Sequence, residues 1–81
     1  MKELREIIHN ASLTKTQQMI AEYILDNSAD ACFMTSTEIA AKLGVSESSV
    51  IRFSRSLGFS GFMDFQKSLR KDYQDKVLSI S

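Results

Sequence analysis

The sequence predicts an all-α fold, organised as one compact domain of five helices. The chain has 81 residues, no proline and only three glycines, so little in it interrupts a helix. Apolar residues recur at helical spacing along most of its length, and no stretch alternates for long enough to predict a strand. Two short helical patterns are separated only by Gly44, Val45 and Ser46. This spacing is typical of a helix-turn-helix motif.

The first predicted helix covers about residues 2–10. It places Leu4, Ile7 and Ile8 on one face. A helix of this length is marginal in water on its own. We therefore expect this face to dock either on the rest of the domain or on a second copy of the chain.

The second helix is predicted to follow Thr14, because Thr14 and Gln17 have the spacing of a capping box. Ile20 and Ile24 then recur at helical spacing, and the pattern ends near residues 27–28. Residues 29–34 form a connector that has room for one helical turn. Phe33 is the residue expected to anchor this connector in the core.

The third and fourth helices are predicted over residues 36–43 and 46–57. Thr35 and Glu38 form a second potential capping box, and Ser46 is positioned to cap the fourth helix. Gly44 and Gly58 follow the two helices, where a left-handed backbone conformation is common. Apolar side chains fill the space between the helices: Ile39, Ala40, Leu43, Val45, Val50, Phe53 and Leu57.

Ser60 is predicted to start the fifth helix. Its apolar stripe comprises Phe62, Phe65, Leu69 and Tyr73, with Val77 and Ile80 as its continuation. The phenylalanines at 53, 59, 62 and 65 could stack on single-stranded bases, but their helical spacing favours the core. Residues 1–75 are therefore assigned to the domain, and residues 76–81 to the start of a linker.

The formal net charge is zero, but the charges are unevenly distributed. Residues 36–71 contain six cations and three anions, whereas residues 1–35 contain three cations and five anions. The middle of the chain is thus mildly basic, with a surplus of three charges. This surplus is compatible with nucleic acid as a partner but is far from a strong basic patch.

The face of the fourth helix opposite its core residues presents Ser48, Arg52 and Arg55, flanked by Ser49 and Ile51. A helix that enters the major groove needs small residues for close approach and groups that pair with bases or phosphates. Arginine offers a bidentate fork to guanine or phosphate, and serine can donate or accept.

Arg52 is the first candidate to read a base, followed by Ser48, Ser49 and Glu47. Glu47 could accept from a cytosine amino group, or it could simply be a first-turn carboxylate favoured by the helix dipole. Phosphate contacts are expected from the third helix. The predicted DNA-binding residues are Ser36, Thr37, Lys42, Ser46, Glu47, Ser48, Ser49, Ile51, Arg52 and Arg55.

Other classes of function find little support. The single histidine, His9, has no partner at metal-ligand spacing or for a catalytic triad, so we predict no metal, no cofactor and no enzyme activity. Cys32 is expected to be buried and inert. The start of the chain lacks a secretory signal, and no apolar run could span a bilayer. A cytoplasmic location without membrane contact is expected.

Three stretches carry a resemblance to a known family: "LTKTQQMIAEYILDN", "STEIAAKLGVSESSVIRFSRSLGFSGFMDF" and "QKSLRKDY". They resemble the N-terminal domain of the RpiR family of bacterial transcription regulators, over roughly residues 13–73. The resemblance implies double-stranded DNA as the partner and control of sugar or amino-sugar phosphate genes. It also implies a sugar-isomerase-type (SIS) domain after the linker, which would bind the phosphosugar effector outside these 81 residues.

A homodimer is expected, because a single recognition helix contacts too little DNA for a tight specific site. The Leu4, Ile7 and Ile8 face and the stripe formed by Tyr73, Val77 and Ile80 are the candidate dimer contacts. One alternative from another class stays open: the same helices could form a protein–protein interaction module that does not bind DNA.

Overall fold

A computed structural model describes the backbone of residues 3–80 and the side chains of residues 3–77. Within this range the fold is all-α without strands, which confirms the predicted class. The helices are α1 (Leu4–Asn10), α2 (Lys15–Asp26), α3 (Ser28–Ala31), α4 (Ser36–Leu43), α5 (Glu47–Ser56) and α6 (Phe62–Ile80). The Cα radius of gyration is 12.0 Å, close to the roughly 12 Å expected for a compact domain of this length.

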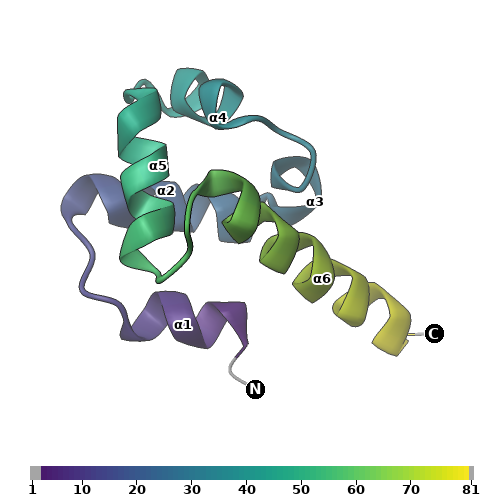
Figure 1. Cartoon of the computed structure of the whole chain (residues 1–81). Helices are drawn as coiled ribbons and strands as arrows, with labels where there is room; N and C mark the ends of the chain where they lie inside the picture. Colours follow the sequence, from purple (N-terminus) through teal and green to yellow (C-terminus); the bar gives the residue numbers. More distant parts are fainter. Residues whose placement is uncertain (1–2, 81) are drawn as a thin grey trace.

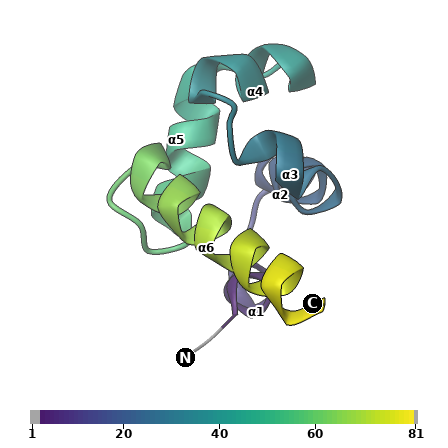
Figure 2. The same ribbon diagram turned by 90° about the vertical axis from the view of Figure 1, so that its right-hand side faces the viewer.

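The long helix α6 crosses the molecule and contacts α1, α3 and α5 (Figure 1). Helix α4 packs on α5, and α5 also packs on α2. Figure 2 shows α4 and α5 at one end of the molecule and α1 at the other. One continuous core joins all six helices: Leu4, Ile8, Ile20, Ala21, Ile24, Ala31, Cys32, Ile39, Ala40, Val50, Phe53, Phe62, Phe65 and Leu69.

Both predicted capping boxes are present. The Thr14 hydroxyl accepts from the Gln17 backbone N–H, and the Gln17 side chain accepts from the Thr14 backbone N–H. Thr35 and Glu38 make the same reciprocal pair at the start of α4. Each box satisfies two backbone donors that the first turn of a helix leaves without partners.

The two helices of the motif end in the same way. Gly44 and Gly58 have φ values of +69° and +96°, a region that L-residues rarely adopt. In each case the next residue donates its N–H back to the last turn: Val45 to the Ala40 carbonyl at 2.9 Å, and Phe59 to the Ser54 carbonyl at 3.2 Å. This is the helix-ending arrangement predicted from the glycines.

Phe53, Phe62 and Phe65 lie in the core, as predicted, and Phe59 packs against it. Phe65 forms the centre of the cluster, with ring centroids 5.5 Å from Phe53, 5.6 Å from Phe59 and 6.0 Å from Phe62. The first two pairs are edge-to-face, a favoured geometry for aromatic rings. The cluster fixes α5 against the start of α6.

The connector after α2 differs from the prediction. The helical turn for which it had room is present as the short α3, but Phe33 is 79% exposed instead of anchoring the connector. Ala31 and Cys32 are buried in its place. The Gln66 side chain donates to the Ala31 and Met34 carbonyls at 3.1 and 2.6 Å. Side-chain hydrogen bonds to the backbone therefore perform the anchoring that we assigned to an aromatic ring.

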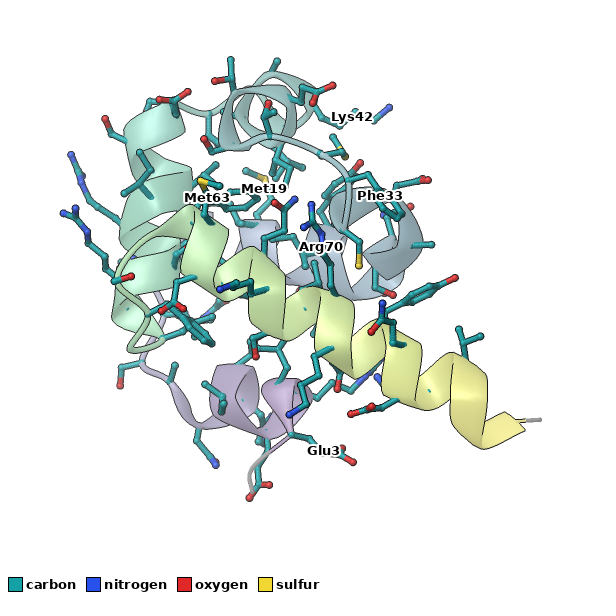
Figure 3. The ribbon with its side chains drawn as sticks, turned by 45° about the vertical axis from the view of Figure 1, so that its right-hand side comes forward. Glu3, Met19, Phe33, Lys42, Met63 and Arg70 are labelled. Carbon is teal, nitrogen blue, oxygen red and sulfur yellow. The ribbon has the colours of Figure 1, made fainter. Side chains whose placement is uncertain are left out.

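Arg70 completes this anchor. Its Nε donates to the Cys32 carbonyl at 2.8 Å, and its guanidinium carbon lies 5.9 Å from the centre of the Phe33 ring. Figure 3 shows Phe33 on the connector and Arg70 on α6 beside it. The exposed ring thus covers an arginine that holds the backbone.

Helix α6 begins at Phe62 rather than Ser60. Ser60 lies in a bend before the helix, and its backbone N–H donates to the Asp64 carboxylate at 3.1 Å. The helix continues to Ile80. Residues 76–80, which we assigned to a linker, are therefore helical, and the domain boundary at residue 75 stays a prediction.

The face of α1 is not free for a second copy. Leu4 and Ile8 are 3% and 6% exposed within the domain's own core. Of the other proposed dimer stripe, Tyr73 is half-buried and Val77 is 48% exposed. The Ile80 side chain and the first residue of the predicted first helix, Lys2, lie outside the described part of the chain.

Candidate nucleic-acid interface

Helix α5 is held by its inner face. Val50, Phe53 and Ser54 are each 0% exposed, and they pack in the core. The Ser54 hydroxyl donates to the Val50 carbonyl at 3.3 Å, so this buried polar group is satisfied within its own helix. A small residue at this position allows α5 to pack closely on its neighbours.

The opposite side of α5 faces away from the protein. Ser48, Arg52 and Arg55 are exposed, and Ile51 beside them is half-buried. At about 100° per residue, the three exposed side chains lie within about 60° of one another around the helix axis. Among the described residues, neither arginine has an ion-pair partner and none of the three makes a side-chain hydrogen bond. We call Ser48, Ile51, Arg52 and Arg55 the α5 outer face.

The N-terminal end of α5 is more tightly engaged. The Ser46 hydroxyl accepts from the Ser49 N–H at 3.2 Å and lies 2.9 Å from the Ser49 hydroxyl. The Thr37 hydroxyl donates to the Glu47 carboxylate, which joins the first turns of α4 and α5. Thr37 and Glu47 were each predicted to contact DNA independently. In the structure they are bonded to each other.

Lys42 lies apart from the other predicted residues. It is at the last turn of α4, whereas Ser36 and Thr37 are at the first. Lys42 borders a surface hollow of about 350 Å³, together with Tyr23, Asp30, Phe33 and Met34. Figure 3 shows Lys42 pointing away from α5. The structure therefore gathers nine of the ten predicted residues around the start of α4 and the length of α5, and places Lys42 on another surface.

One contact that reaches this site could not be predicted from the sequence. The Gln17 side chain, predicted only as part of a cap, also donates to the Ser56 hydroxyl at the end of α5, at 3.0 Å. The two residues are 39 positions apart. No local pattern could have paired them, because the contact depends on how α2 packs against α5.

The described residues contain no cluster of histidine, cysteine and acidic side chains suited to a metal ion. His9 is exposed at the end of α1. Cys32 is 1% exposed, and this burial raises the pKa of its thiol, an effect that the positive charge of Arg70 partly opposes. A thiol kept neutral is a poor nucleophile. The burial of Cys32 is therefore consistent with the low reactivity expected of it.

No helix in the described range is long and apolar enough to cross a membrane.

Comparison with known proteins identifies a relationship over nearly the whole chain. Residues 2–76 match the family described as "Helix-turn-helix domain, rpiR family". The chain is 35% identical over 63 residues to an uncharacterized HTH-type transcriptional regulator of Clostridium perfringens, CPE0189. It is 39% identical over 67 residues to an uncharacterized HTH-type transcriptional regulator encoded in the aarA 3' region of Providencia stuartii.

These alignments include 78% and 82% of the present chain, but only 23% and 24% of the two relatives. The chain thus spans about a quarter of the length of the curated relatives that it matches.

Proposed function

Because the chain belongs to the RpiR family of helix-turn-helix domains, we propose that it binds double-stranded DNA sequence-specifically, as one domain of a transcription regulator. The single observation that carries this proposal is the α5 outer face. Two arginines and a serine project from a helix whose other side is fully buried. Such a helix can enter the major groove without rearrangement of the core.

In this proposal Arg52, near the middle of α5, reads the DNA. Its guanidinium can donate two hydrogen bonds to guanine O6 and N7, the commonest specific contact in the major groove. Ser48 lies one turn before it and permits close approach. Arg55 is near the end of the helix and pairs with a phosphate, and Ile51 offers an apolar contact to a thymine methyl group.

The first turns of α4 and α5 bind the DNA backbone. Ser36, Thr37, Ser46 and Ser49 place hydroxyl groups beside helix N-termini, where backbone N–H groups and the helix dipole favour phosphate. These contacts fix the register of the protein on the duplex without reading sequence. Glu47 has one carboxylate oxygen, Oε2, bonded to the Thr37 hydroxyl, and its Oε1 can accept from a cytosine amino group.

Dimerisation is part of the proposal. Two copies would read half-sites about one turn of DNA apart, which doubles the contacts that one short α5 can make. The exposed Val77 and the half-buried Tyr73 on α6 support this helix as a contact between copies. Residues 1–75 would then form the DNA-binding unit.

The regulated genes are proposed to serve sugar or amino-sugar phosphate metabolism in the cytoplasm. Support comes from the family resemblance and from the relatives, which are more than three times as long as this chain. The phosphosugar effector would bind a SIS domain outside these 81 residues.

One observation favours the alternative, a protein–protein interaction module. Phe33 is 79% exposed on the connector, beside the hollow that Tyr23 and Met34 also line. A partner chain that docked there would leave the α5 outer face unused. The two functions are separated by testing whether α5 is needed for DNA binding.

The test begins with selection of bound DNA from a random pool. Arg52→Ala should then weaken binding to the selected sequence by about 10-fold to 100-fold and relax the preference at one base pair. Arg5→Ala is the matched control, since it removes one exposed cation from α1. The proposal is wrong if no sequence is enriched, or if Arg52→Ala binds the selected DNA as tightly as Arg5→Ala does.

A further inference from the structure

The side-chain amide of Gln17 makes two hydrogen bonds, one through its oxygen and one through its nitrogen. Its Oε1 accepts from the Thr14 backbone N–H at 3.0 Å, which closes the capping box of α2. Its Nε2 donates to the Ser56 hydroxyl at 3.0 Å, at the end of α5. The first contact belongs to the local structure of α2, and the second joins two helices.

The first contact determines the orientation of the second. A backbone N–H can only donate, so the amide oxygen must face Thr14 and the NH2 group must face Ser56. Glutamate, the other residue typical of this capping position, would keep the bond to Thr14 but could meet Ser56 only as an acceptor from its hydroxyl. Glutamine therefore suits both partners at once.

The Gln17 contact has a counterpart at the other end of α5. Within the described side chains, two hydrogen bonds join α5 to other helices: Gln17 to Ser56 from α2, and Thr37 to Glu47 from α4. Nine positions separate Glu47 from Ser56, which at about 100° each is two and a half turns. The two bonds therefore act at opposite ends and on opposite sides of α5, an arrangement that resists both rotation and tilt.

The rotation of α5 matters most at Arg52. Ser56 follows Arg52 by four positions, so the two side chains lie about 40° apart around the axis and one turn apart along it. Apolar packing of the inner face holds α5 on the core but is not directional, whereas a hydrogen bond weakens steeply with misalignment. The bond at Ser56 thus restrains the direction in which Arg52 points.

We infer that Gln17 is a positioning residue for DNA recognition, acting through Ser56 on the orientation of α5. The inference rests on the proposed function and extends it to a residue outside the interface. Base contacts require accurate placement of a side chain, whereas contacts with phosphates tolerate small shifts. Loss of the Gln17–Ser56 bond should therefore reduce selectivity for the preferred sequence more than it reduces general affinity for DNA.

The experiment measures dissociation constants for the selected DNA and for random-sequence DNA of equal length, together with the thermal midpoint. Ser56→Ala should lower the ratio of the two affinities by about 5-fold, the scale of one ordinary hydrogen bond. Binding to random DNA should not change. Ser56→Thr keeps the hydroxyl and should retain the wild-type ratio. Gln17→Ala combined with Ser56→Ala should be no less selective than Gln17→Ala alone.

Thr14→Ala separates positioning from stability. It removes the Thr14 hydroxyl cap of α2 and should lower the thermal midpoint, but it keeps the backbone N–H that orients Gln17. Selectivity should therefore be retained in Thr14→Ala and lost in Ser56→Ala. An equal loss of selectivity in both variants would mean that the effect follows stability, and the inference would be wrong.

The remaining outcomes are also distinguishable. If the wild-type domain selects a sequence and Ser56→Ala selects it equally well, the positioning role is refuted and the proposed function stands. If the wild-type domain shows no preference for any sequence, the proposed function fails and the positioning role fails with it.

Discussion

Replacement of Gln66 by methionine tests whether the connector between α3 and α4 is held by side-chain hydrogen bonds. Gln66 is 9% exposed and donates to the Ala31 and Met34 carbonyls. Methionine fills a similar volume without a donor, so the Met34 carbonyl would lose its partner and the Ala31 carbonyl would keep only the Met34 backbone N–H at 3.4 Å. A lost partner of this kind costs about 1–3 kcal/mol, and for the pair we expect the free energy of unfolding to fall by about 2 kcal/mol.

For a domain of this size, a loss of about 2 kcal/mol should lower the thermal midpoint by about 8–16 °C. Circular dichroism measures this shift directly. The exposed Gln74 on the same helix provides the matched control, and Gln74→Met should change stability by less than about 0.5 kcal/mol. Hydrogen exchange adds a local readout, since the Cys32 and Phe33 amides, which donate to the Ser28 and Asp30 carbonyls, should exchange faster in Gln66→Met. Equal midpoints for Gln66→Met and Gln74→Met would refute this account of the connector.

Two further predictions concern a helix end and the thiol. Gly58→Ala should cost about 1–2 kcal/mol of unfolding free energy, because φ is +96° and the added methyl group meets no atom within 4 Å, so only backbone strain remains. Gly61→Ala, also in open space but without a positive φ, should have little effect by the same denaturation measurement. Cys32 should resist Ellman's reagent in the folded domain at about pH 8 and react at once in guanidinium chloride. Rapid labelling of the folded domain would contradict its burial.

The raised pKa of Cys32 also predicts the direction in which the stability of the domain changes with pH. Because the folded state holds the thiol proton more strongly than the unfolded state, this contribution to stability is present below the unfolded pKa and is lost as pH rises above it. Replacement of Cys32 by alanine would remove this pH dependence of the unfolding free energy at alkaline pH.

The starts of α2 and α4 and the ends of α4 and α5 could be predicted because the signals that set them are local. Thr14 lies within one turn of Gln17, and Thr35 lies within one turn of Glu38. Gly44 supplies a left-handed conformation that few other residues adopt. The outer face of α5 could also be predicted from the sequence, since helical periodicity alone separates Val50 and Phe53 from Arg52 and Arg55. These features depend on positions at most a few residues apart.

The connector could not be predicted in the same way. An aromatic residue between helices usually indicates burial, so Phe33 was the natural anchor. The position of Gln66 and Arg70 on α6 instead brings polar donors to the carbonyls of Ala31, Cys32 and Met34. These pairs lie more than 30 positions apart in the chain, so only the packing of α3 on α6 creates them. The Gln17–Ser56 contact escaped prediction for the same reason.

The neutral net charge limits how this domain can bind DNA. The α5 outer face carries two arginines, and Arg70 is already engaged with the Cys32 carbonyl. Each phosphate neutralised by a cation contributes about −0.9 to the slope of log affinity against log salt concentration. Arg55, the arginine of this face that is assigned to a phosphate, gives a slope of about −0.9 per domain, and a dimer gives about −1.8.

Salt titration of the selected DNA complex therefore reports which cations reach the duplex. A slope between about −0.9 and −1.8 agrees with Arg55 as the only cation that neutralises a phosphate in a monomer or dimer. A slope near −3.6 for a dimer would add one cation per domain, and Lys42→Ala would decide whether that cation is the lysine at the far end of α4. A slope near zero would mean that no phosphate is neutralised, and DNA binding through α5 would then be wrong. With so few cations available, tight binding to one sequence must come from base contacts and from pairing of two domains, which is why the orientation of α5 matters more here than charge.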